Sequence, residues 1–132
     1  MTSPIAYLSN AGRLDRMFID GEWTLPEHPT RTDVVDPSTE EPIAGIALGG
    51  RADVDVAVAA ARRAFAGWAA TSPESRAQFL DRVHALLLER VELFAQAISQ
   101  EMGAAIGYAR SAQVPLAAEH IRVARDNLAT YP

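Results

Sequence analysis

The sequence predicts an α+β fold, in which two short β-hairpins precede about four helices. Two turn signals mark the hairpins: the Asp20-Gly21 dipeptide between apolar residues, and a proline-bracketed turn at residues 36–42. From Asp53 onward, apolar residues recur with the spacing of a helix. Because the strands come first and the helices follow, the two kinds of element do not alternate, which is typical of the α+β class.

The N-terminal half of the chain contains the predicted strands. Residues 1–16 have no regular apolar period, so we expect a mobile leader ahead of the folded part, residues 17–132. Residues 17–23 predict a tight hairpin. After a loop, residues 32–35 and 43–48 predict a second pair of strands, and the prolines between them exclude central-strand pairing at that turn.

The first predicted helix covers residues 53–68. Asp53 and Asp55 lie in its first turn, where the helix dipole favours carboxylates, and Gly67 marks its end. One apolar stripe runs along it with the spacing of a 3.6-residue helix. Its members are Val54, Val58, Ala61, Phe65 and Trp68.

Further helices follow. Ser72 is a good N-cap and Pro73 suits the first helical position, so a second helix starts there. Its apolar face is formed by Phe79, Leu80, Val83, Leu86 and Leu87. A third helix, residues 92–102, stops at Gly103.

The last part of the chain is also predicted to be helical. Residues 105–114 look helical, Pro115 interrupts them, and a final helix covers residues 116–128. Its core candidates are Leu116, Ile121, Ala124 and Leu128.

The composition excludes several classes of function. Among 132 residues, 12 are basic and 17 acidic, and a net charge of −5 argues against binding nucleic acid or an anionic membrane surface. There is no cysteine, so disulfides, thiolate metal sites and a thiol nucleophile are excluded. All the cations are arginines, so no lysine can form a Schiff base or hold a phosphate or ribose. With no bilayer-length apolar run and no secretory signal, we expect a cytoplasmic protein.

Five motifs, in order, resemble the N-terminal part of NAD(P)-dependent aldehyde dehydrogenases. They are residues 18–23 (FIDGEW), 35–43 (VDPSTEEPI), 53–68, 72–77 (SPESRA) and 101–103 (EMG). Asp36 stands where the family usually has Asn, and Glu40 where it usually has Gly. Residues 113–115 (QVP) resemble the bacterial branch that acts on broad or poorly defined aldehydes.

The resemblance implies NAD(P)-linked oxidation of an aldehyde to a carboxylic acid, on a Rossmann-like α/β cofactor-binding domain of which this chain forms a portion. It also implies that the nucleophilic cysteine, the water-activating glutamate, the oxyanion-hole asparagine, the ribose-binding lysine and the glycine-rich turn all lie beyond the matched region. We therefore expect a truncated family member that is inactive alone. We assign no catalytic, cofactor-binding or metal residue to it, and the NAD or NADP ligands are expected elsewhere.

Three motifs in the chain suggest chemistry only weakly. The order strand, Gly49-Gly50, helix is that of a phosphate loop, but the spacing of Gly45 from these glycines does not fit G-x-G-x-x-G, and we interpret the segment as a plain turn. The histidines show no metal-ligand spacing; they are His28, His84 and His120. Glu119 could orient His120 as a base, but neighbours on a helix point about 100° apart.

Two further possibilities involve charged or main-chain groups. The resemblance implies that the Val35 carbonyl and the Glu101 side chain could bind a monovalent cation, although backbone pairing and helix capping explain both residues. Arg62 and Arg63 predict a solvated helix face, with an inter-chain ion pair as the alternative.

Three functional hypotheses remain open at this point. The chain is a piece of a dehydrogenase, one half of a split enzyme, or a non-enzymatic helical interaction module. The first two require the remainder of the dehydrogenase or a complementing chain as partner. Bare apolar helix faces also favour self-association.

Overall fold

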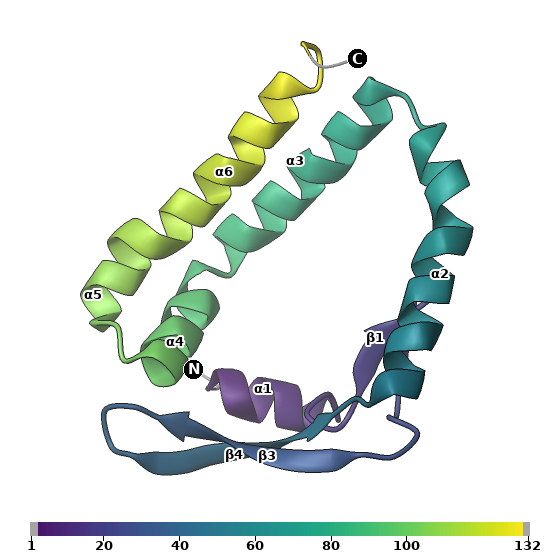
Figure 1. The fold of residues 1–132 in the computed structure, drawn as a ribbon. Helices are drawn as coiled ribbons and strands as arrows, with labels where there is room; N and C mark the ends of the chain where they lie inside the picture. Colours follow the sequence, from purple (N-terminus) through teal and green to yellow (C-terminus); the bar gives the residue numbers. More distant parts are fainter. Residues whose placement is uncertain (1–2, 131–132) are drawn as a thin grey trace. The chain divides into compact units, whose positions relative to one another are not determined.

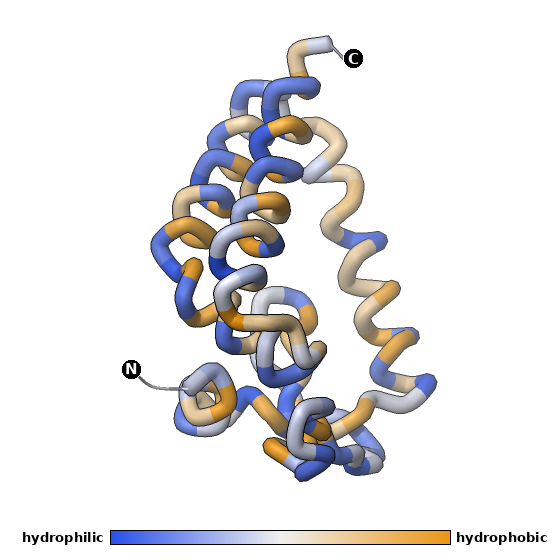
Figure 2. The backbone as a smooth tube through the Cα atoms, turned by 90° about the vertical axis from the view of Figure 1, so that its left-hand side faces the viewer, coloured by the Kyte–Doolittle hydropathy of each residue, from blue (hydrophilic) through white to orange (hydrophobic). Residues whose placement is uncertain are grey.

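The computed structural model describes residues 3–130 and consists of two compact units, residues 1–69 and residues 70–132. The first unit holds both hairpins and two helices, and the second is helical (Figure 1). The predicted α+β class is confirmed. Hydrophobic and hydrophilic residues alternate along the helices, so no helix is apolar all round (Figure 2).

The first hairpin forms where the Asp-Gly signal predicted it. β1 (Met17–Ile19) pairs antiparallel with β2 (Glu22–Thr24). Asp20 and Gly21 have φ angles of 54° and 85°. Positive φ at both central residues matches the right-handed twist of the flanking strands, and Gly and Asp adopt it at low cost.

The second hairpin is longer than predicted. β3 (Thr30–Asp36) pairs antiparallel with β4 (Glu41–Leu48), with a bulge between Val34 and Val35. Pro42 lies opposite Val35 beside this bulge. A proline is tolerated there because the sheet has only two strands and the ladder is already interrupted.

The turn of this hairpin is held by Asp36. Its carbonyl accepts a hydrogen bond from Glu40 N (2.8 Å), and its side-chain Oδ1 accepts one from Ser38 N (2.8 Å). The hydrogen bonds from Ser38 hold the pKa of the Asp36 carboxyl below its usual range. Glu40 has φ 61°, a left-handed conformation that glycine adopts more easily. Glu40, which stands where the resembling family usually has Gly, therefore occupies the position of this turn that favours glycine.

Residues 1–16 contain a helix that the sequence analysis did not predict. α1 (Pro4–Asn10) begins with a Ser3 N-cap, whose Oγ accepts a hydrogen bond from Ala6 N (3.1 Å). The Ser-Pro start is the same signal that was recognised at Ser72, but here it precedes a helix too short to show a period. Beyond the helix, Leu14 O accepts a hydrogen bond from Ala47 N of β4 (3.1 Å). The mobility of the leader stays a prediction.

α2 (Arg51–Ala69) starts two residues before the predicted position and continues through Gly67. Its apolar stripe is not buried: Val54 is 58% and Phe65 is 71% exposed. The buried residues of α2 are Asp53 and Ala60, on the face that packs against β1. The hairpin covers a different face of the helix, so the apolar stripe is left bare in this chain, as expected for a piece of a dehydrogenase.

The second unit begins as predicted. α3 (Pro73–Glu89) is capped by Ser72, whose Oγ accepts a hydrogen bond from Ser75 N (3.2 Å). α4 (Val91–Met102) ends at Gly103, which has φ 69° and donates its N–H to Ser99 O (3.0 Å). Both caps are thus confirmed at the predicted residues.

The predicted interruption at Pro115 does not occur, but Pro115 does stand in the first turn of the last helix. α5 (Ile106–Tyr108), the π-helical η1 (Ala109–Gln113) and α6 (Val114–Asn127) follow one another without a break. Val114 N–H donates to Ala109 O, five residues earlier. Proline in a regular α-helix would clash with the carbonyl four residues before it. The wider π-turn lies directly ahead of Pro115 and accommodates the ring.

The core of the second unit is small. Ala95, Ala109 and Val114 are fully or almost fully buried, and Leu87, Val91 and Ile98 pack around them. α3 and α6 lie side by side (Figure 1). Of the predicted core candidates in α6, Ile121 and Leu128 are half-buried, whereas Leu116 and Ala124 are exposed. Leu116 lies about 140° round the helix from Ile121, whereas the buried Val114 and Ala118 share the face of Ile121, so Leu116 points away from the core.

The substitution Glu40→Gly should stabilise the chain. The left-handed conformation costs a residue with a side chain about 1–2 kcal/mol, and the greater freedom of glycine in the unfolded chain offsets part of this gain. We expect the free energy of unfolding to rise by about 0.5–1 kcal/mol in urea denaturation. Glu40→Ala removes the same side chain and keeps the strained backbone, so it should bring no gain. Equal stabilisation by both variants would contradict the backbone explanation.

Candidate functional site

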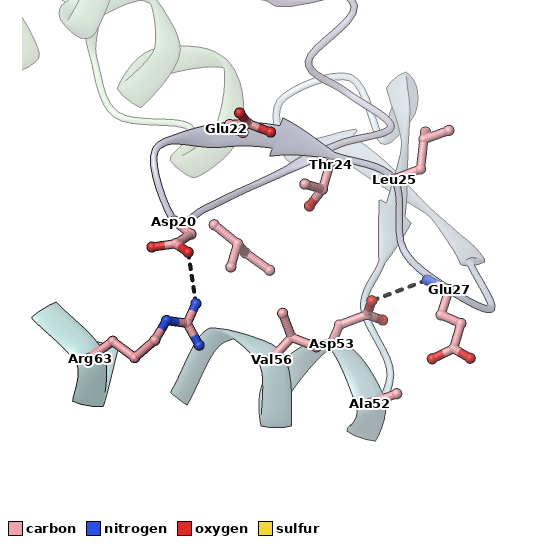
Figure 3. A pocket seen from close by; sticks show the side chains of 10 residues that line it. Asp20, Glu22, Thr24, Leu25, Glu27, Ala52, Asp53, Val56 and Arg63 are labelled. Carbon is pink, nitrogen blue, oxygen red and sulfur yellow. Dashed lines mark hydrogen bonds and ion pairs between the residues drawn. The ribbon is translucent and has the colours of Figure 1, made fainter. Parts of the chain in front are cut away.

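A hollow lined largely by polar residues lies between α2 and the first hairpin. It has a volume of about 460 Å³, and α2, the hairpin turn and the segment after β2 line it (Figure 3). Its polar lining residues are Asp20, Glu22, Thr24, Glu27, Asp53 and Arg63. The Thr24 hydroxyl already donates to the carbonyl of Met17 (3.4 Å).

Asp53 ties the start of α2 to the loop after β2. The residue is 8% exposed, Oδ2 accepts a hydrogen bond from Gly50 N (2.7 Å), and Oδ1 accepts one from Glu27 N (3.1 Å) (Figure 3). A carboxylate in the first helical turn satisfies an N–H that the helix leaves unpaired and lies at the positive end of the dipole. The sequence analysis noted the dipole contribution of Asp53 but missed its contact with Glu27, 26 residues away.

The same contacts decide the phosphate-loop interpretation. A phosphate at a helix N-terminus is bound by free backbone N–H groups. Here the Gly50 N–H is occupied by Asp53, whose negative charge stands where the phosphate would lie. The structure supports the plain turn at residues 49–50. A Cβ at Gly49 would lie 2.6 Å from Met17 Sδ, so the flexible Met17 side chain would have to move.

Arg63 closes the other end of this cavity. Its Nη2 donates to Asp20 Oδ2 at 2.7 Å, across the hairpin turn (Figure 3). Arg62 and Arg63 were predicted to form a solvated face, and Arg62 is exposed as expected, but Arg63 makes an ion pair within the chain. Both side chains of this pair are more than half exposed, so the pair orients the hairpin more than it stabilises the fold.

The three histidines do not form a site. The His28 side chain is 90% exposed, with Nε2 3.9 Å from Glu27 Oε1. His84 is half-buried on α3, and His120 is exposed on α6. Within residues 3–130, no three histidine, aspartate or glutamate side chains gather closely enough to hold a metal ion.

Glu119 is not available as an orienter for His120. Arg122 Nε and Nη2 both donate to the Glu119 carboxylate, and this hydrogen bonding, with the charge of Arg122, holds the pKa of Glu119 below its usual range. The two residues suggested for a cation site lie in β3 and in the last turn of α4: they are Val35 and Glu101, both exposed.

An arginine–carboxylate fork joins α4 to the π-turn. Arg110 Nε donates to Glu92 Oε2 (2.7 Å) and Arg110 Nη2 to Glu92 Oε1 (2.9 Å), while Gln96 Nε2 also donates to Glu92 Oε1 (3.0 Å). Hydrogen bonding to Arg110, followed by that to Gln96, lowers the pKa of Glu92 to about 2. Sequence reasoning missed this contact because the π-turn changes the direction in which residue 110 points.

Comparison with known proteins identifies the family. The family model described as "Aldehyde dehydrogenase family" matches residues 23–131. The 3-succinoylsemialdehyde-pyridine dehydrogenase of a Pseudomonas species is 37% identical over 115 residues, which are 86% of this chain and 24% of that protein. The human 2-aminomuconic semialdehyde dehydrogenase is 36% identical over 114 residues, 86% of this chain and 23% of that protein.

Solved structures give the same result. A mutant of aldehyde dehydrogenase C from Pseudomonas syringae, in complex with NAD+ and octanal, superposes with a TM-score of 0.89 at 60% identity, covering 92% of this chain and 25% of that one. An aldehyde dehydrogenase from Bartonella henselae superposes with a TM-score of 0.85 at 38% identity, and the match covers 89% of this chain and 25% of that one. The chain belongs to the aldehyde dehydrogenase family and spans about a quarter of the length of these relatives.

None of the helices in residues 3–130 combines the length and the apolar character that crossing a bilayer requires.

Removing the Asp53 carboxylate should destabilise the first unit. Asp53→Ala leaves the N–H groups of Gly50 and Glu27 without their carboxylate acceptor, and a hydrogen bond to a charged group contributes about 1.5–3 kcal/mol. We expect the free energy of unfolding to fall by about that amount in urea titration. Asp55→Ala is the matched control, because Asp55 lies in the same turn of α2 and is exposed. Equal effects of the two variants would show that the dipole, not the buried contacts, carries the stabilisation.

The fork predicts a specific dependence of stability on pH. The pKa of Glu92 is about 2 in the folded chain, against 4.5 as its ordinary value. Its ionised form is therefore favoured by folding, and the contribution is complete above pH 4.5 and is lost as the pH falls toward 2.

The variant Glu92→Gln tests this dependence by urea titrations across the acidic range. The wild type should be more stable than the variant at neutral pH, and the difference should shrink below pH 4.5. Glu101→Gln, on the same helix and away from Arg110, is the control. A stability difference that stays constant down to pH 2 would contradict this role of the fork.

Proposed function

We propose that this chain forms the N-terminal part of an NAD(P)-dependent aldehyde dehydrogenase, which oxidises an aldehyde to a carboxylic acid. The observation that carries the proposal is the match with aldehyde dehydrogenase C, at 60% identity and a TM-score of 0.89, because that relative was solved with NAD+ and octanal. The cofactor would accept the hydride of the aldehyde. The choice between NAD and NADP and the identity of the aldehyde depend on residues outside these 132.

In this proposal the chain supplies scaffold and no catalytic group. It has no cysteine to act as the thiolate nucleophile and no lysine to hold the cofactor ribose. Among the carboxylates that line the cavity, Asp53 is hydrogen-bonded and Asp20 is ion-paired within the chain, which suits a structural connection between hairpin and helix. Catalytic and cofactor-binding residues are therefore expected in the remainder of the dehydrogenase.

The exposed stripe of α2 supports the need for that remainder. Val54, Val58 and Phe65 are 58%, 44% and 71% exposed, although they lie on one line along the helix. Burying an apolar side chain of this size stabilises a protein by about 1.5–3 kcal/mol. A surface that covers the stripe would gain this free energy for each of the side chains that it buries. The remainder of the dehydrogenase is the partner that we propose for this stripe. An uncovered apolar stripe of this kind favours self-association of the chain. The cytoplasmic location stays a prediction.

A chimeric enzyme tests the proposal. Residues 17–130 would replace the corresponding quarter of aldehyde dehydrogenase C, and NADH formation from octanal would be followed. If the segment carries the family's N-terminal function, kcat/KM should stay within roughly tenfold of the parent value. The 132-residue chain alone should form no NADH. A chimera that folds and binds NAD+ but lacks activity would contradict the proposal.

Phe65→Asp in the chimera examines the role of the stripe. A carboxylate on the covered face should prevent assembly, so soluble folded enzyme and activity should fall together. The adjacent Ala66→Asp introduces the same charge on a different side of α2 and should leave both unchanged. If the two variants behave alike, the stripe is not a buried surface in the enzyme.

A further inference from the structure

β3 has an outer edge that no other strand covers. The sheet it forms with β4 has two strands, and in residues 3–130 no backbone hydrogen bond reaches Arg31 or Asp33 from outside this sheet. The Asp33 carboxylate is exposed and makes no ion pair in the described part of the chain. A two-stranded ribbon is marginally stable alone, so additional pairing at this edge would be favourable.

The direction of the backbone groups on this edge follows from one contact of β4. Ala47 N donates to Leu14 O, which lies outside the sheet, so this group points away from β3, and Gly45, two residues earlier, has the same orientation in the ladder. Ala47 lies opposite Arg31 and Gly45 opposite Asp33. In an antiparallel ladder, the two residues of such a pair both point outward. The backbone N–H and C=O groups of Arg31 and Asp33 therefore face the free edge.

If β3 paired antiparallel with β3 of a second copy, several symmetric registers would be conceivable. Only one of them places residues with outward backbone groups opposite each other and also brings oppositely charged side chains together. Centred on Asp33, two carboxylates would lie directly opposite, and like charges there destabilise a sheet. Centred on Arg31, two guanidinium groups would be opposed and Asp33 would lie opposite Pro29, which has no N–H. Centred on Thr32, Arg31 lies opposite Asp33 of the second copy, and each such pair exchanges two backbone hydrogen bonds.

We propose that the free edge of β3 pairs antiparallel with the same edge of a second copy of this chain, with Thr32 on the two-fold axis. The Arg31 guanidinium leans toward β4 and bonds Asp15 and Gly45 O, so its attraction to Asp33 of the second copy acts across the pair and not through a direct ion pair. Pro29 and the bulge at Val34 limit the pairing to a short segment. The result is a weak, self-complementary dimer with a defined register.

Single cysteines test the register, because the native chain has none. Residues facing each other in a non-hydrogen-bonded pair have Cα atoms about 4.5 Å apart, within the range that a disulfide bridges. Thr32→Cys should therefore give a disulfide-linked dimer under mild oxidation, read on a non-reducing gel. Thr39→Cys, in the exposed turn of the same hairpin, is the control. We expect Thr32→Cys to react faster by roughly tenfold or more, because pairing raises the effective concentration of the second thiol.

Two neighbouring positions separate this register from random collision. Thr30→Cys and Val34→Cys should each cross-link no faster than the control, since either residue lies about 13 Å from its own copy along the strand. When the Thr30→Cys and Val34→Cys variants are mixed, a disulfide should form between one chain of each, because Thr30 faces Val34 of the second copy in this register. Equal reaction of all four single variants would mean non-specific association through apolar faces such as the α2 stripe, and it would overturn the proposal.

Charge reversal gives an independent test. Asp33→Arg in the Thr32→Cys background opposes two arginines across the axis and should slow cross-linking to the rate of the Thr39→Cys control. Asp33→Asn removes only the attraction and should have a smaller effect. If Asp33→Arg cross-links as fast as the parent variant, the proposed register is wrong.

Discussion

The buried carboxylate of Asp53 fixes the first unit. It accepts hydrogen bonds from the N–H groups of Gly50 and Glu27, so a single side chain defines both the start of α2 and the path of the chain after β2. The hairpin is then placed over α2, and the Asp20–Arg63 pair holds its far end. Because the two contacts differ in burial, they differ in role: the buried one carries stability, and the exposed one selects orientation.

The second unit depends on close packing of small residues. Ala95 and Ala109 are fully buried, which lets η1 approach α4 closely enough for Arg110 to reach Glu92. The π-turn serves two purposes there, since it accommodates Pro115 and directs Arg110 at its partner. A regular helix through residue 115 would lose a backbone hydrogen bond and turn residue 110 in another direction.

Local chemistry was predictable from the sequence, and the direction of faces was not. The Asp20-Gly21 turn, the Ser72 cap and the Gly103 stop each depend on a few adjacent residues, and all three were located correctly. The contacts of Asp53, Arg63 and Arg110 join residues 18 to 43 positions apart, and no local pattern encodes them. α1 had the right signal in Ser3-Pro4 but no apolar period to accompany it. Family membership was recognisable because the five motifs are local and occur in order.

The apolar stripe of α2 is left exposed in this chain. Periodicity identifies a face that the native protein covers, but it does not say which polypeptide segment covers it. α2 has two such faces, and the hairpin occupies the one formed by small residues around Ala60. The larger residues, Val54 and Phe65, remain exposed. Small residues permit close approach of a hairpin, whereas large ones suit a broad surface such as a sheet face. The apolar stripe thus lies beside the face that the hairpin covers, and it is open to the partner proposed for it.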